Sequence, residues 1–158
     1  MKPVENSNKG ERSMSDYEKV YSTRGVNENG RDGRSYIEGG DFEVQVSAPG
    51  KDKPGTTNPE QLFALGYSAC FNGALEAVKG QENVDGKSVV RNQVDLYAKP
   101  GQADFRLAVR IEVGIDGVDK DKVQELADKA HTVCPYSKAV QNGDIDVEVV
   151  AVDFQDAK

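Results

Sequence analysis

Residues 58–78, NPEQLFALGYSACFNGALEAV, decide the fold. Asn58 is a favourable helix N-cap and Pro59 suits the first helical position, so the segment opens as helices do. Residues 62–78 contain a single charged side chain, Glu76, and are apolar on nearly every face. A helix that lacks a polar face belongs in the interior of a protein. We therefore expect a long central helix that other elements cover.

On both sides of this helix the sequence alternates polar and apolar residues, as strands do. Residues 87–98 and 104–115, with the turn KPGQA between them, predict an antiparallel hairpin. Further strands are expected at residues 17–23, as two pieces within 34–48, and at 145–154. NENGRDG (27–33) is typical of a hairpin turn, and residues 49–57 of a loop.

A second helix is predicted at residues 119–133, and Pro135 ends or bends it. Its apolar residues share one face: Val123, Leu126, Ala127, Ala130 and Val133. Strands, a buried helix, strands, an amphipathic helix and a final strand follow one another along the chain. This order predicts the α+β class and not a doubly wound parallel sheet.

Composition narrows the possible functions. The 158 residues suffice for one domain, and we assign residues 16–158 to it after a disordered tail at 1–15. The net charge is −7 with scattered basic residues, which argues against nucleic-acid binding. No stretch has the length and apolarity of a signal peptide or a membrane span, so we expect a cytoplasmic protein with no membrane partner.

The two cysteines, Cys70 and Cys134, allow two interpretations. In helical geometry Gly66 and Gly73 flank Cys70, which provides either close helix packing or room for a small ligand beside the sulfur. Cys134 directly precedes Pro135, where it can cap a following helical turn whose N–H groups would lower the pKa of a thiol. From the residues alone, inert buried thiols are the commoner explanation.

Three other polar residues also have two interpretations each. His131 lies three residues before Cys134, but one histidine and two cysteines fall short of the four ligands of a structural zinc site, so we expect no metal. Arg31 is either solvated surface or a permanent cation that a loop presents to an anionic centre. Glu60 is either a partner of the helix dipole or part of that same centre.

Three motifs in this order and spacing resemble the organic hydroperoxide resistance (Ohr) proteins of the OsmC/Ohr superfamily. They are NGRDG (29–33), GTTNPEQLFALGYSACFNGAL (55–75) and AHTVCPYSKAV (130–140), followed by GDIDVEVV. The resemblance covers about residues 17–154. It implies antiparallel sheets wrapped around a buried central helix in an intertwined homodimer, and a thiol peroxidase that reduces alkyl and fatty-acid hydroperoxides to alcohols.

The resemblance also implies a role for each site residue. Cys70 attacks the peroxide, Cys134 resolves the resulting sulfenic acid into a disulfide, and Arg31 and Glu60 complete the site. No cofactor is expected, and a lipoylated protein serves as the dithiol reductant. These roles suit the residue types: a guanidinium keeps a thiolate charged, a carboxylate holds the guanidinium, and a second thiol prevents over-oxidation. Leu62, Phe63 and Phe71 are expected to line a pocket for the peroxide tail.

Glu60 and Cys70 are ten residues apart, which is about 15 Å along an unbroken helix. Either the helix breaks near Gly66, or Glu60 reaches Cys70 from a separate segment or from the other subunit. The chain departs from the family pattern at Asn72, where a small or apolar residue is usual, and at residues 139–145. An OsmC-type peroxidase of broader range and a non-catalytic redox sensor or ligand-binding protein are the alternative functions.

Overall fold

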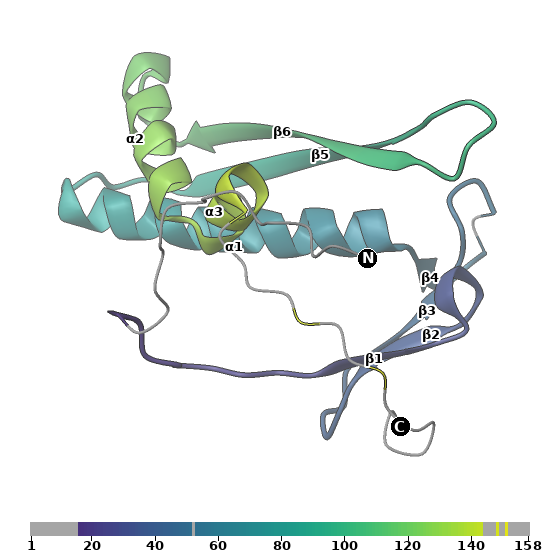
Figure 1. Ribbon diagram of the computed structural model, residues 1–158. Helices are drawn as coiled ribbons and strands as arrows, with labels where there is room; N and C mark the ends of the chain where they lie inside the picture. The colour runs from purple at the N-terminus through teal and green to yellow at the C-terminus, as the bar shows by residue number, and fades with distance from the viewer. Residues whose placement is uncertain (1–15, 52, 144–147, 149–150, 152–158) are drawn as a thin grey trace, which may run out of the picture.

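The computed structural model describes residues 16–51, 53–143, 148 and 151, and its described part is an α+β fold (Figure 1). A four-stranded sheet comes first, with the order β1-β2-β3-β4. The strands are β1 (Gly25–Glu28), β2 (Arg34–Ile37), β3 (Glu43–Val46) and β4 (Thr56–Thr57). The first three are antiparallel, whereas β4, in the predicted loop, pairs parallel to β3.

The predicted hairpin turn joins β1 to β2 and contains a single turn of 3-10 helix, Gly30–Asp32. Asn29 and Gly30 enter this turn with φ values of 64° and 62°, the left-handed conformation that asparagine and glycine adopt most readily. The turn places Arg31 at one end of the sheet, close to the start of the first long helix.

Helix α1 (Pro59–Gln81) runs without interruption for 23 residues. The predicted N-cap is confirmed, because the side chain of Asn58 accepts a hydrogen bond from the backbone N–H of Gln61 at 2.8 Å. In the single chain α1 is covered on one side and open on the other, where Leu65 is 66% exposed. The expectation of a helix buried all round is therefore wrong for one chain taken by itself.

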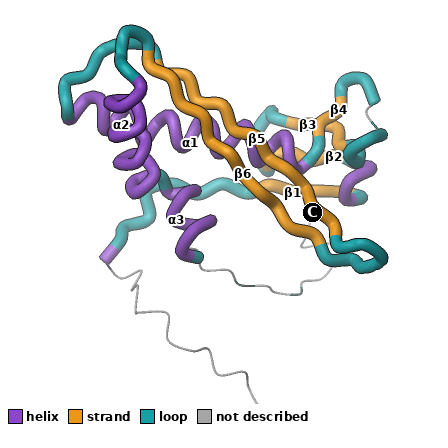
Figure 2. Tube along the Cα trace, turned by 90° about the horizontal axis from the view of Figure 1, so that it is seen from above, coloured by secondary structure: helices purple, strands orange, loops and turns teal. Residues whose placement is uncertain are grey.

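The antiparallel hairpin is also confirmed: β5 (Ser88–Ala98) pairs with β6 (Phe105–Ile115) along its whole length. Seen from above, the hairpin crosses α1 diagonally, with the other two helices to one side and the small sheet to the other (Figure 2). Burial alternates along residues 88–94 of β5 and 109–115 of β6, as the sequence pattern predicts, whereas residues 105–108 at the start of β6 are all exposed.

Helices α2 (Lys120–Val133) and α3 (Pro135–Asn142) pack against α1 beside the hairpin. The core lies where these elements meet, and its buried apolar residues are Tyr67, Phe71, Ala74, Leu75, Val78, Ile115, Val123, Leu126, Ala130 and Cys134. The predicted apolar face of α2 is correct except at Val133, which is 49% exposed because α2 ends there and the chain turns away into α3.

The N-terminal segment differs from the prediction. Residues 17–23 form no strand, since no other strand pairs with them in the described part of the chain, and Val20 is 93% exposed. Among the described residues, no helix is both long and apolar enough to cross a membrane. The predicted tail at 1–15 lies outside the described residues, as does nearly all of the predicted strand at 145–154, so both stay predictions.

Candidate functional site

The fold brings the two cysteines together from positions 64 residues apart in the chain. Cys70 lies on α1, and Cys134 ends α2 and caps α3. The two sulfur atoms are 3.5 Å apart and both thiols are free. Cys134 is completely buried and Cys70 is half-buried. A disulfide needs a sulfur separation of about 2 Å, so a small movement of either side chain would allow one to form.

The start of α3 faces Cys70 rather than Cys134. Cys134 occupies the predicted N-cap, but its side chain makes no capping hydrogen bond. The backbone N–H of Tyr136, in the first turn of α3, bonds instead to the sulfur of Cys70 and acts to lower the pKa of that thiol. Burial has the larger effect and the Cys134 thiol adds to it, so the pKa of Cys70 is raised in the single chain.

Arg31 and Glu60 form a bidentate ion pair at the start of α1. The two guanidinium nitrogens donate to the two carboxylate oxygens at 2.8 and 2.6 Å. The hydrogen bond from Arg31 holds the pKa of Glu60 below its ordinary value, and Glu60 in turn raises the pKa of Arg31. Both groups are therefore charged across the physiological pH range, and Arg31 is a fixed cation that its partner holds in one orientation.

These two pairs lie apart within one chain. Helix α1 continues through Gly66, which excludes the alternative of a break there, and Glu60 and Cys70 stay about 15 Å apart along the axis. Gly66 instead makes room for Tyr136, because a β-carbon at this position would lie 3.2 Å from the Tyr136 hydroxyl oxygen. The structure brings Cys70 to Cys134 and Arg31 to Glu60, but it does not bring Arg31 to Cys70.

A mostly apolar cavity of about 500 Å³ is bounded by α1, β6, α2 and α3; neither cysteine lines it, although Tyr67 and Phe71 of its wall flank Cys70 on α1. Its walls are Phe63, Tyr67, Phe71, Leu107, Val109, Ile111, Val113, Gln124, Ala127, Asp128, His131, Val140 and Gln141. Phe63 and Leu107 also line a smaller cavity of about 340 Å³ that contains Arg31 and Glu60. The predicted pocket residues Phe63 and Phe71 are thus present, whereas Leu62 lines a different cavity beneath the small sheet.

Sequence reasoning missed a buried hydrogen-bonded group next to the thiols. The hydroxyl of Ser137 bonds to the hydroxyl of Tyr67 at 2.7 Å and to Nδ1 of His131 at 2.8 Å. His131 therefore has a serine partner, and within the described ranges no three His, Cys, Asp or Glu side chains are placed to share a metal ion. The sequence did carry a signal that could have indicated this group, because Tyr67 and Ser137 have polar hydroxyls on helix faces that are otherwise apolar.

Asn72, which departs from the family pattern, faces away from the thiols and toward β5. Its side-chain oxygen accepts a hydrogen bond from Ser88 at 2.6 Å, and the same hydroxyl contacts Glu76. Asn72 therefore links α1 to the first residue of β5, and it is not among the residues that line the cavity of about 500 Å³.

This α+β domain with two adjacent free thiols has known relatives. A family model described as OsmC-like protein matches residues 50–150, and the chain belongs to this family. It is 40% identical over 122 residues to organic hydroperoxide resistance protein OhrB of Bacillus subtilis, which covers 76% of this chain and 89% of the relative.

Other comparisons agree with this assignment. The organic hydroperoxide resistance protein of Xanthomonas axonopodis pv. citri is 39% identical over 140 residues, covering 85% of this chain and 96% of that protein. The crystal structure of Bacillus subtilis OhrB superposes with a TM-score of 0.71 at 36% identity, covering 82% of this chain and 97% of that one. The α+β fold with antiparallel sheets is thus that of the Ohr structures.

Proposed function

We propose that this protein is a thiol-dependent peroxidase that reduces alkyl and fatty-acid hydroperoxides to alcohols. The observation that carries the proposal is the 3.5 Å separation of two free thiols, of which Cys134 is buried and Cys70 half-buried. The names of the relatives, which are organic hydroperoxide resistance proteins, support the substrate class. The cavity volume of about 500 Å³ supports an extended hydrocarbon tail.

In the first step the thiolate of Cys70 attacks the outer oxygen of the hydroperoxide. A sulfur–oxygen bond forms, the oxygen–oxygen bond breaks, and the alkoxide that leaves takes up a proton to become the alcohol. Cys70 is then a sulfenic acid. The half-buried Cys70 is the thiol that a substrate can reach, and the backbone N–H of Tyr136 stabilises negative charge on its sulfur.

This step also needs a cation, since burial raises the pKa of Cys70 in the single chain. We propose that the Arg31–Glu60 pair of a second subunit supplies it, because α1 holds the pair of the same chain too far away. A guanidinium beside the sulfur would lower the pKa of Cys70 and stabilise the leaving alkoxide. Glu60 keeps this guanidinium oriented through its two hydrogen bonds.

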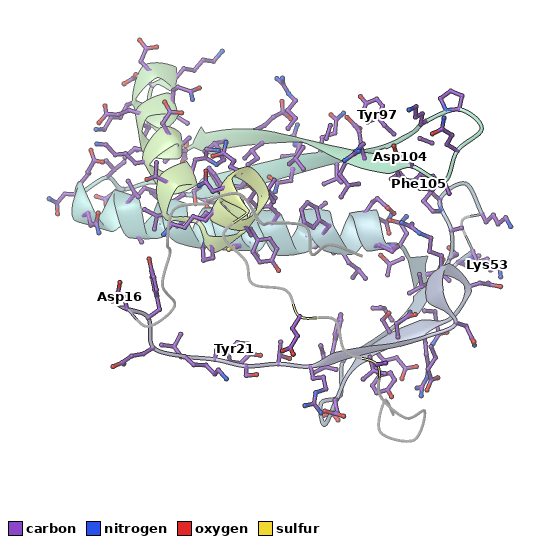
Figure 3. All side chains as sticks on the ribbon, in the orientation of Figure 1. Asp16, Tyr21, Lys53, Tyr97, Asp104 and Phe105 are labelled. Atoms are coloured by element: carbon purple, nitrogen blue, oxygen red, sulfur yellow. The ribbon has the colours of Figure 1, made fainter. Side chains whose placement is uncertain are left out.

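A homodimer is supported by the surface that a single chain leaves open. Exposed small and apolar residues recur every fourth position along α1: Leu65, Ala69, Gly73 and Ala77. The extended segment that carries Asp16 and Tyr21 runs well clear of its own α1 (Figure 3). A second copy that packs its helix on this face and receives the extended segment would bury both, giving the intertwined arrangement.

In the second step the thiol of Cys134 attacks the sulfenic acid, which gives a Cys70–Cys134 disulfide and water. An external dithiol of the lipoyl type, carried by a partner protein, then reduces this disulfide by thiol exchange and is itself oxidised to a cyclic disulfide. We place the cycle in the cytoplasm, where both cysteines return to the thiol form between turnovers. No metal, haem or flavin takes part in the proposed cycle.

The proposal is tested by following the consumption of cumene hydroperoxide with a lipoyl dithiol as reductant. Cys70→Ser should abolish turnover. Cys134→Ser should react once and leave a sulfenic or over-oxidised Cys70, which intact-mass analysis detects. Ser68→Ala is the matched control, since its hydroxyl bonds within α1 to the carbonyl of Leu65.

The outcomes separate the alternatives. Turnover that is faster with hydrogen peroxide than with cumene hydroperoxide would contradict this substrate class and favour a peroxidase of broader range. Thiols that oxidise but give no turnover with any dithiol would favour a redox sensor. A Cys70→Ser variant as active as the wild type would end the proposal, because a group other than Cys70 would then be the nucleophile.

A further inference from the structure

Ser137 joins three helices through two hydrogen bonds. It lies on α3 and is only 1% exposed, and it contacts Tyr67 of α1 and His131 of α2. A serine hydroxyl carries one proton, so Ser137 donates one of these two bonds and accepts the other. The three residues therefore form a directional chain of hydrogen bonds inside the protein.

The charge of His131 sets the direction of this chain. A neutral imidazole with a bare Nδ1 accepts from Ser137, and Tyr67 must then donate to Ser137. An imidazolium can only donate, so Ser137 then donates to Tyr67 and the phenolic proton of Tyr67 is released for another acceptor. Imidazole is the side chain that ordinarily changes charge between about pH 5 and 8.

The Tyr67 end of the chain lies next to the thiols. Tyr67 precedes Cys70 by one helical turn on the same face of α1 and is 2% exposed. Burial raises the pKa of Tyr67, and negative charge on Cys134 or Cys70 raises it further, which places the phenol within electrostatic reach of both sulfurs.

The His131 end opens into the cavity of about 500 Å³, whose wall it shares with Tyr67. Three other elements contribute groups near the imidazole or to the wall of the same cavity. Its own helix contributes the carboxylate of Asp128 to the same cavity, α1 contributes the ring of Phe71 at 6.3 Å, and the residues contributed by β6 are apolar. The chain thus runs from a phenol one helical turn from Cys70 to an imidazole that borders the cavity.

We propose that Tyr67, Ser137 and His131 form a proton relay for disulfide formation, an inference that rests on the peroxidase cycle proposed above. The sulfur of Cys134 bonds to the sulfur of Cys70, and the sulfur–oxygen bond of the sulfenic acid breaks. Neutral His131 takes the thiol proton of Cys134 through the two hydroxyls, and the imidazolium returns it by the reverse path to the leaving hydroxide, which departs as water. Ser137 and His131 are positioning residues, since they act through Tyr67.

The relay is tested in single-turnover experiments with one equivalent of cumene hydroperoxide, quenched by an alkylating reagent. The chain has no tryptophan, so intact mass and not fluorescence reports the sulfenic acid and the disulfide. In Ser137→Ala, sulfenic acid should form at the wild-type rate, whereas in both Ser137→Ala and His131→Asn the disulfide should form about 100-fold more slowly. The pH dependence that the wild type shows in this second rate should disappear in both variants.

Ser68→Ala again serves as the matched control and should keep the wild-type rate and pH profile. A Ser137→Ala variant with the wild-type pH profile of disulfide formation would overturn the relay, even if His131→Asn lost that profile. The imidazole would then act by its electrostatic field and not by proton transfer through Ser137. If Ser137→Ala does not fold, Ser137→Thr, which retains the hydroxyl, should keep the profile that His131→Asn loses; loss of the profile in both would overturn the relay. If cumene hydroperoxide yields no sulfenic acid, the peroxidase proposal fails by itself, and the same step is measured on sulfenic acid formed with hydrogen peroxide.

Discussion

Closing the Cys70–Cys134 disulfide should stabilise the protein against unfolding by about 4 kcal/mol. The bond would close a loop of 64 residues, and the chain-entropy relation for a loop of this length gives roughly 14.5 cal/mol/K, or about 4.3 kcal/mol at 25 °C. Strain in the folded state should subtract little, because the sulfurs start only 3.5 Å apart. For a chain of 158 residues this corresponds to a rise in Tm of roughly 10 °C.

Thermal unfolding followed by circular dichroism measures this difference between protein reduced with dithiothreitol and protein oxidised with one equivalent of hydroperoxide. Both samples must have the same protein concentration, since association also contributes to Tm. Cys134→Ser, treated in the same way, should show no such rise. An unchanged Tm in wild-type protein whose intramolecular disulfide is proven by intact mass would refute the reasoning. The strain that the bond adds to the folded state would then equal the stabilisation gained by restricting the unfolded chain.

Three further predictions concern stability and assembly. Arg31 lowers the pKa of Glu60, so the Glu60 carboxylate takes up its proton at lower pH in the folded protein than in the unfolded chain. The contribution of the ion pair to the free energy of unfolding is therefore complete above the ordinary carboxyl pKa of 4.5. It is lost as the pH falls through the pKa of Glu60 in the folded protein. Urea midpoints measured from pH 6 to 3 should therefore converge between wild type and Glu60→Gln at the acid end; a constant difference would contradict this. Asn58→Ala removes the N-cap of α1 and should lower the free energy of unfolding by about 1 kcal/mol, measured by urea titration, and an unchanged midpoint would mean that the cap contributes nothing. Ala69→Glu places a charge on the open face of α1 and should shift the protein to monomers in analytical ultracentrifugation, whereas a persistent dimer would locate the interface elsewhere.

Sequence rules correctly predicted the helix start and the strand that depend mainly on residues close together in the chain. Asn58 and Pro59 define the start of α1 because capping depends on neighbouring residues alone. The alternation along residues 104–115 defines β6, since one face of the hairpin packs on α1 and the other meets solvent. The thiol pairing came from the family resemblance, because two cysteines 64 residues apart carry no local signal of contact.

The sequence-based predictions were incorrect where the structure depends on tertiary contacts. Residues 17–23 have strand-forming composition, but a strand requires a partner, which a single chain does not give them. A helix normally loses stability at a glycine, yet α1 continues through Gly66 because the ring of Tyr136 packs against it. The N–H groups at the start of α3 were assigned to Cys134, whereas the direction of that helix aims one of them at Cys70.

The uninterrupted course of α1 has a consequence for how the two sites of a dimer depend on each other. The helix is a rigid spacer, with the Arg31–Glu60 pair at one end and Cys70 near its middle, so in the dimer proposed above each site would take its cation from the neighbouring chain. Two inactive variants should then complement one another. A mixed dimer of one Glu60→Gln chain and one Cys70→Ser chain contains one site with both native Glu60 and native Cys70, whereas neither variant by itself forms such a site. A single subunit contains a thiol pair and an Arg31–Glu60 pair that belong to different sites, so dissociation of the dimer on dilution should abolish the peroxidase activity.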